Sequence, residues 1–188
     1  MPYYVLKSKF TGVLIMRKPV ISGNLEFDFG VQKKLDIPTI NFVMDKDNSQ
    51  GELTDFISTT LPGLTISKKF KQALDKAGVD NIDYYPARVT NEVTREVFED
   101  IYVANVIGLI ACMDTEKSEY ETYPGIPNKI NEIDTLVLHD NAIKGYKIFR
   151  LKEFSTLVIV DENVKDAIEN AGITNTICIP VEEFDTYL

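Results

Sequence analysis

Residues 64–86 read LTISKKFKQALDKAGVDNIDYYP, and residues 158–180 read VIVDENVKDAIENAGITNTICIP. The two stretches align without a gap, and apolar residues fall at the same positions in both. The matched identical residues are Lys71 and Lys165, Ala73 and Ala167, Ala77 and Ala171, Gly78 and Gly172, Asn81 and Asn175, and Pro86 and Pro180. A match of this kind indicates one supersecondary unit used twice. We call residues 64–86 the first unit and residues 158–180 the second unit.

Each unit is predicted to begin with a strand and continue as a helix. A short apolar run comes first, Leu64–Ile66 in one unit and Leu157–Val160 in the other. Ser67 and Asp161 then stand where a helix N-cap belongs, since their side-chain oxygens can accept the first free helix N–H groups. Apolar residues spaced i, i+3, i+4 and i+7 follow, which places them on one helix face. They are Phe70, Ala73, Leu74 and Ala77 in the first unit and Val164, Ala167, Ile168 and Ala171 in the second.

Glycine and proline mark the end of each unit. Gly78 and Gly172 stand just past the helix, where a left-handed backbone costs glycine little. A second strand follows, at Ile82–Ala87 or Thr176–Val181, and its proline predicts a sheet edge or a strand end. Each unit is therefore predicted to be a strand, a helix of roughly ten residues and a strand.

The N-terminal part of the chain is predicted to be mostly strand. Short runs rich in β-branched and aromatic residues are separated by Gly, Pro or Asn. These runs predict strands at Tyr3–Leu6, Val13–Met16, Leu25–Phe29 and Thr39–Met44. The segment Gly51–Thr60 fits either one short helix or an irregular loop.

The region between the two units is predicted from its apolar runs and its prolines. Asp100–Met113 is a long apolar stretch interrupted by a glycine, which predicts either a bulged strand or two paired strands. Ser118–Asn128 contains Tyr-Pro-Gly and Ile-Pro and is predicted to be a loop. Ile133–Leu138 and Tyr146–Leu151 are predicted to pair around a turn at Asp140–Gly145.

Length and composition favour one globular domain over residues 1–188. The chain is 44% hydrophobic and 26% charged, which allows a sizeable core and disfavours disorder. The predicted fold class is α+β, strand-rich and mostly antiparallel, with a strand-rich N-terminal part at residues 1–60. The sequence shows no run of eighteen apolar residues and no signal-peptide layout, so we expect a cytoplasmic protein without a membrane partner.

Negative charge is concentrated in the second half of the chain. Residues 1–90 hold 12 Lys or Arg against 10 Asp or Glu, whereas residues 91–188 hold 8 against 19. Nucleic-acid binding is disfavoured, because phosphate contact needs a basic face. A solvated face that aids solubility is the ordinary role of a single acid, but the whole run also fits a surface that steers a basic protein partner. The acids between Thr90 and Tyr123 are Glu92, Glu96, Glu99, Asp100, Asp114, Glu116, Glu119 and Glu121.

Catalytic motifs are scarce in this sequence. His139 is the only histidine, and at the end of a predicted strand a structural or surface role outweighs catalysis. Asp114, Glu116 and Ser118 could supply acid–base or cation-binding groups, although a turn capped by Asp and Ser side chains is the commoner arrangement. The sequence contains neither a glycine-rich phosphate loop nor zinc-ligand spacing. We therefore predict no cofactor and no metal.

Four stretches in fixed order carry a resemblance to a known family. They are Ile66–Gly78 with Ile82–Pro86, Tyr102–Asn105 leading to Met113–Ser118, Gly145–Leu151, and Ile159–Asp161 with Ala171–Ile173 and Ile179–Val181. In order and spacing they resemble a bacterial immunity-protein family of polymorphic toxin systems. The resemblance implies binding without catalysis: such a protein is made beside a toxin and occludes the active site of that toxin.

Three functional hypotheses follow. On the first, the chain is an immunity protein whose acidic half fits a basic, nuclease-like toxin, with Tyr120 and Tyr123 as apolar anchors. The proposed partner-binding residues are Glu92, Glu96, Glu99, Asp114, Glu116, Glu119, Tyr120, Glu121 and Tyr123. On the second, it is an adaptor or scaffolding module with an unrelated partner. On the third, it is a hydrolase-type enzyme that would need Asp114, Glu116 and His139 to converge in a pocket.

Overall fold

The computed structural model describes residues 2–9, 15–16, 39–44, 46–47, 53–59 and 63–187. The strands are β1 (Tyr3–Ser8), β2 (Ile15–Met16), β3 (Ile40–Met44), β4 (Phe56–Ile57), β5 (Leu64–Ser67), β6 (Ile82–Asn91), β7 (Val97–Val106), β8 (Leu109–Ile110), β9 (Glu119–Tyr123), β10 (Ile126–Thr135), β11 (Ile148–Leu151), β12 (Val158–Asp161) and β13 (Thr176–Pro180). The helices are α1 (Lys68–Lys76), α2 (Asp140–Ile143) and α3 (Glu162–Asn170), and a 3-10 turn covers Val181–Glu183.

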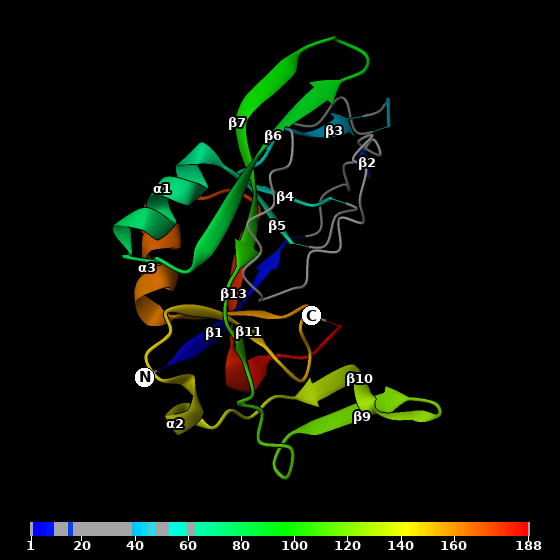
Figure 1. Cartoon of the computed structure of the whole chain (residues 1–188), viewed down its shortest axis with the longest axis vertical. Coiled ribbons are helices and arrows are strands. Elements are labelled where there is room, and N and C mark those ends of the chain that lie inside the picture. The colour runs from blue at the N-terminus through cyan, green and yellow to red at the C-terminus, as the bar shows by residue number, and fades with distance from the viewer. Residues whose placement is uncertain are drawn as a thin grey trace.

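Within these residues the strands form three sheets (Figure 1). One sheet has the order β13-β1-β12-β11-β8, and a second has the order β2-β3-β6-β7-β5-β4. The third is a separate two-stranded ribbon of β9 and β10. Neighbouring strands are antiparallel except in the pairs β3–β6 and β8–β11. The predicted class, a strand-rich and mostly antiparallel α+β fold, is confirmed.

The two units share one topology. In the first, β5 and β6 flank β7, which is antiparallel to both, so the two strands joined by α1 run parallel. In the second, β12 and β13 flank β1 in the same way and are joined by α3. A hairpin partner extends each unit, β4 beside β5 and β11 beside β12. The helices α1 and α3 lie side by side on the same flank of the molecule (Figure 1).

The ends of both helices are fixed by the residues that the sequence singles out. The backbone N–H of Phe70 donates to Ser67 Oγ at 3.2 Å, and that of Val164 donates to Asp161 Oδ1 at 2.9 Å. Each helix is nine residues long. Gly78 and Gly172 follow with φ of +72° and +60°. This left-handed conformation ends the helix and lets the free carbonyls of its last turn accept hydrogen bonds. The predicted strand, helix and strand are thus confirmed in each unit.

Two pairs of matched polar residues have matched structural roles. Lys71 and Lys165 each bridge an acid one helical turn on, at 2.7 and 2.8 Å, and lie over the rings of Tyr84 and Tyr4. Such i,i+4 pairs contribute only a few tenths of a kcal/mol. Asn81 Nδ2 donates to the carbonyl of Ile148 at 2.9 Å, and Asn175 Nδ2 donates to the carbonyl of Phe56 at 2.8 Å.

These two asparagines cross from one unit to the other. Asn81 of the first unit reaches β11, the hairpin partner of the second unit, and Asn175 of the second unit reaches β4, the hairpin partner of the first unit. Each amide therefore ties a helix-to-strand connection to the opposite sheet. This shared task gives a physical reason for the same residue at both positions.

One apolar core is shared by the two units. Phe70, Leu74, Val164 and Ile168 are all buried in it, as their spacing predicts. The core also takes Leu64, Ile66, Ala104, Val106, Ile148, Val158 and Val160 from the two sheets. Each such large side chain contributes about 1.5–3 kcal/mol when fully buried. Both helices are therefore buried in one core, to which both sheets contribute side chains.

A carboxylate also ties the two halves together. Asp55, just before β4, accepts the backbone N–H of Thr174 at 3.0 Å and its hydroxyl at 3.1 Å. It also accepts the hydroxyl of Ser67 at 2.6 Å and the ammonium of Lys69 at 3.2 Å. Burial raises the pKa of Asp55, but these hydrogen bonds outweigh burial and leave the pKa below its usual value.

The prolines behave differently in the two units. Pro180 ends β13, an edge strand of its sheet, as predicted. Pro86 is inside β6, which runs on to Asn91 as an interior strand, so the prediction of an edge or strand end is wrong there. In the described residues β3 pairs with β6 only from Ala87 onward. The missing N–H of Pro86 therefore falls before that ladder begins.

Four predicted segments in the first 113 residues have different outcomes. Residues 53–59 contain the short strand β4 where a helix or an irregular loop was predicted for Gly51–Thr60. Asp100–Met113 is neither one bulged strand nor a hairpin: β7 ends at Val106, and β8 joins the other sheet. Of Val13–Met16, Ile15 and Met16 form β2. The predicted strand Leu25–Phe29 lies outside the described residues.

Two predictions beyond residue 113 are wrong. Ser118–Asn128 is not a loop: Tyr-Pro-Gly-Ile closes a hairpin between β9 and β10, with φ of +80° at Gly125. Ile133–Leu138 and Tyr146–Leu151 do not pair, because β10 pairs with β9 and β11 pairs with β12 and β8. The short helix α2 begins where the turn Asp140–Gly145 was predicted. Its Ile143 is buried, which gives that turn a core contact.

Candidate functional site

Most of the predicted partner-binding residues fall on two hairpins at opposite ends of the molecule, and Asp114 and Glu116 lie in a turn before the second one. Glu92, Glu96 and Glu99 lie on the β6–β7 hairpin, which forms one end of the long axis (Figure 1). Glu119 and Glu121 lie on the β9–β10 ribbon near the other end. Acids that are close in sequence therefore do not form one continuous surface.

Asp114 belongs to a turn and not to an exposed surface. Only 6% of its side chain is exposed, and its Oδ1 accepts the backbone N–H groups of Glu116 and Lys117, both at 3.2 Å. Ser118 Oγ completes the turn by accepting the N–H of Val137 at 3.0 Å. The hydrogen bond from Lys117, with the charges of Lys117 and His139, holds the pKa of Asp114 below its usual value. The capped-turn role is the one these contacts describe.

The residues of the enzyme hypothesis come together only in part. His139 Nδ1 is 3.7 Å from Asp114 Oδ2, and the imidazole is 59% exposed. Glu116 contacts Asp114 only by donating its backbone N–H to the Asp114 carboxylate, and its own side chain is exposed. Burial raises the pKa of Cys112 to about 12 and that of Cys178 to about 11, so both thiols stay protonated at neutral pH.

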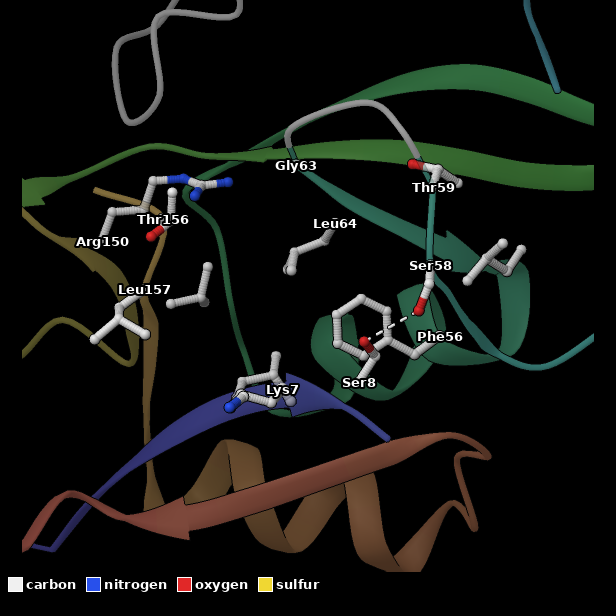
Figure 2. A pocket seen from close by; sticks show the side chains of 13 residues that line it. Lys7, Ser8, Phe56, Ser58, Thr59, Gly63, Leu64, Arg150, Thr156 and Leu157 are labelled. Atoms are coloured by element: carbon white, nitrogen blue, oxygen red, sulfur yellow. Dashed lines mark hydrogen bonds between the residues drawn. The ribbon is translucent and has the colours of Figure 1, made fainter. Parts of the chain in front are cut away.

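A cavity of about 350 Å³ lies between the two large sheets (Figure 2). Arg150 and Thr156 stand on one wall, and Ser8 and Ser58 stand on the other, where their hydroxyls are 3.1 Å apart. Arg150 is 2% exposed and donates from Nη1 to the carbonyl of Ser155 at 3.0 Å. Burial lowers its pKa to about 10, which leaves the guanidinium protonated at neutral pH.

The chemistry of this cavity is limited by its lining. Among the described residues that line it there is no His, Cys, Asp or Glu, so a general base beside its serines would have to be Lys7. Asp114, Glu116 and His139 lie outside it. In the described part of the chain no cluster of three or more His, Cys, Asp or Glu side chains could hold a metal ion.

The β9–β10 ribbon has a core-facing side and a solvent side. Tyr120 on β9 and Ile130 and Ile133 on β10 pack against the body of the protein. Glu119, Glu121 and Tyr123 alternate with Tyr120 and are exposed. Of the two predicted anchors, Tyr123 therefore faces solvent and Tyr120 faces the core.

Three residues on the solvent side were not among the sequence candidates. Glu132 lies directly opposite Glu121 in the ladder, and Asp134 follows on the same strand. The hydroxyl of Tyr187 donates to Glu132 at 2.6 Å. That hydrogen bond, with the charges of Glu132, Glu121 and Asp134, raises the pKa of Tyr187. These three residues lie beyond Tyr123 in the sequence, and only the pairing of β10 with β9 shows that Glu132 lies beside Glu121.

The β6–β7 hairpin ends in an ordered turn. Asn91 Oδ1 accepts the N–H groups of Val93 and Thr94 at 2.9 and 3.1 Å. On β7 both Glu99 and Asp100 lie opposite the single residue Arg88 of β6, so the strand has a bulge there. Asp100 in this bulge has a φ of +60°. The Asp100 carboxylate pairs with Lys68 at 3.2 Å.

Fold and surface together describe an α+β protein with exposed acids on two projecting hairpins, and the cavity between its sheets is lined by no described acid or histidine. Comparison with protein families gives a specific assignment: the chain belongs to the immunity protein family Imm11, whose family model matches residues 7–183. The resemblance seen in the sequence is thereby confirmed over nearly the whole chain. A search of curated proteins found no match. None of the described helices is long and apolar enough to cross a membrane.

Proposed function

We propose that this protein binds a cognate toxin and neutralises it by covering the active site of the toxin, without catalysis of its own. Membership in an immunity protein family is the observation that carries this proposal. The contacts of Asp114 support it, since that carboxylate is engaged by the turn that it caps. We place the interaction in the cytoplasm of the producing cell.

The proposed partner is a basic, nuclease-like toxin domain. The chain carries a net charge of −9, and a toxin that binds phosphate needs a positive surface. An acidic inhibitor can occupy that surface and speed the encounter. The same charge disfavours nucleic acid as a partner of this chain. The predicted contact residues that reach the surface form two alternative sites. One is Glu92, Glu96 and Glu99 on the β6–β7 hairpin, and the other is Glu119, Glu121 and Tyr123 on the β9–β10 ribbon, with Glu116 just before it. Asp114 and Tyr120 face inward.

The test is association with the toxin domain encoded beside this gene, measured by stopped flow at low and high salt. The distance over which exposed charges act on one another falls from about 10 Å at 0.1 M salt to about 3 Å at 1 M. Association should therefore slow as salt rises. Charge reversals within Glu92–Glu121 should slow it more than reversals at Lys7, Lys9 or Lys46. An association rate that neither salt nor these reversals change would contradict electrostatic steering. A toxin domain that does not bind at all would contradict the immunity function.

A further inference from the structure

The solvent side of the β9–β10 ribbon has an uncovered strand edge. The ribbon is a sheet of only two strands, and among the described residues no other strand pairs with β9. The edge of β10 is partly occupied, since Thr186 donates its N–H to the carbonyl of Ile133 at 2.9 Å and accepts the N–H of Ile133 at 2.8 Å. The open edge is therefore that of β9. Unpaired strand edges take up extended segments of other chains.

The same side carries like charges directly opposite one another. Glu121 and Glu132 face one another across the ladder, and like charges in that position destabilise a strand pair. Glu119 and Asp134 extend the negative surface along the two strands. Lys129 lies at the tip of the ribbon over the ring of Tyr123, 4.7 Å from its centroid. A basic segment laid along the ribbon would relieve this repulsion.

Large apolar side chains flank these acids. Tyr187 is 77% exposed, Ile126 is 51% exposed and Tyr123 is 40% exposed. Aromatic residues of this kind supply much of the binding energy in protein interfaces, while charges at the rim mainly set the association rate. The ribbon therefore combines anchors, charge and an open edge on one surface.

The β6–β7 hairpin is the weaker candidate. It also exposes apolar side chains, Val93 and Val97, but its acids have basic neighbours: Arg95 is in its turn, and Lys68 pairs with Asp100. Both residues at its tip are aliphatic, whereas two of the three on the ribbon are tyrosines.

We propose that the solvent side of the ribbon, made by Glu119, Glu121, Tyr123, Glu132, Asp134 and Tyr187, is the surface that binds the toxin. Its occupant is an extended segment of the toxin rich in lysine and arginine, which adds to the edge of β9 and contacts the exposed tyrosines. This inference rests on the proposed immunity function and names the surface through which that function acts.

The first experiment does not need the toxin. A synthetic peptide alternating arginine and threonine is titrated into the full-length protein, with a matched peptide that has glutamate in place of arginine. We expect backbone amide NMR shifts at residues 119–135 and at Tyr187 with the basic peptide alone. Shifts centred on residues 91–100 instead, or the absence of binding, would overturn the inference.

The second experiment uses the toxin domain and two double variants with the same charge change. Glu119→Lys/Glu121→Lys lies on the ribbon, and Glu96→Lys/Glu99→Lys lies on the other hairpin as a control. We expect the ribbon variant to slow association about tenfold relative to the control, within the range that steering covers. Circular dichroism and thermal unfolding establish that both variants fold.

A third variant tests the anchor. Tyr187→Ala removes a side chain that is mostly exposed, so we expect little change in unfolding and a faster dissociation of the complex. If both ribbon variants bind the toxin domain as fast and as tightly as the wild-type protein does, the inference is overturned and the immunity function still stands. Failure of the wild-type protein to bind the toxin domain would refute the immunity function itself.

Discussion

Replacing the two matched glycines by alanine should have unequal effects, although the glycines occupy equivalent positions. Gly78 and Gly172 both have positive φ at the end of a helix. A Cβ on Gly172 would meet no atom within 4 Å, whereas a Cβ on Gly78 would lie 2.7 Å from Lys147 Nζ. That ammonium donates to the carbonyls of Ala77 at 2.7 Å and Gly78 at 3.2 Å, where it caps the end of α1.

The magnitudes follow from these contacts. A left-handed alanine costs about 1–2 kcal/mol, and the stiffer unfolded chain returns about 0.4–1 kcal/mol. Gly172→Ala should therefore destabilise the protein by about 1 kcal/mol. Gly78→Ala must also shift the Lys147 ammonium, the flexible end of that side chain, and weakening its partly exposed hydrogen bonds to the carbonyls costs about 1 kcal/mol more. We therefore expect Gly78→Ala to lower the free energy of unfolding by about 2 kcal/mol. Its melting temperature should be about 2–4 °C below that of Gly172→Ala.

Urea unfolding of the two variants measures this difference, and a third substitution tests its cause. Lys147→Met keeps the apolar stem and removes the ammonium. In that background Gly78→Ala should cost only about 1 kcal/mol, as Gly172→Ala does, because the left-handed strain alone remains. A Gly78→Ala variant no less stable than Gly172→Ala, or one whose cost is unchanged by Lys147→Met, would refute the reasoning.

Three further changes test individual side chains. Asp55→Ala should destabilise by about 2 kcal/mol at neutral pH, because the carboxylate accepts several hydrogen bonds that join the two halves. Since the folded pKa of Asp55 is lowered, its contribution is complete above the unfolded pKa near 4 and disappears as pH falls through the folded value; urea titrations from pH 7 to pH 2 should show wild type and variant converging. Asp114→Asn should likewise reduce stability at neutral pH and make less difference in acid, because the pKa of Asp114 is also lowered; equal differences at both pH values would contradict the charge-based account of its turn. His139→Ala should leave protection against the toxin intact in a cell survival assay, and complete loss of protection with unchanged folding would revive an enzyme hypothesis built on His139 and Asp114.

The parts of the fold that sequence predicts well are local ones. Helix caps and left-handed glycines depend on residues three or four positions away, so Ser67, Asp161, Gly78 and Gly172 could be assigned from spacing alone. Sheet order could not, because it joins residues distant in sequence, such as β1 between β12 and β13. That all residues form one domain stays a prediction, which the shared core supports. Superposition of the two units is likewise a prediction.

The ribbon shows how a correct local signal led to a wrong conclusion. Tyr-Pro-Gly-Ile marks a turn, and the strand before it reads Glu119-Tyr-Glu-Thr-Tyr123, which alternates with period two. The prolines outweighed that alternation, so the hairpin was predicted as a loop. In a two-residue connection Pro and Gly supply the backbone angles of the turn and leave both strands free to pair.

The candidate surface was predictable in sign but not in position. Composition alone shows that the second half of the chain is acidic. The chain then directs Glu96 and Glu121 to opposite ends of the molecule and brings Glu132 and Tyr187 beside Glu121. Such groupings depend on strand register, because a shift of one residue would move every side chain of the strand to the other face.

The central claim is neutralisation by binding, and a titration of toxin activity with this protein tests it most directly. With toxin held well above the dissociation constant, activity should fall in a straight line and reach zero at equimolar protein. Toxin recovered from the complex by denaturation and refolding should be active again and unchanged in mass. Complete loss of activity at a small fraction of one equivalent, or a toxin of altered mass, would contradict the account and identify the protein as an enzyme.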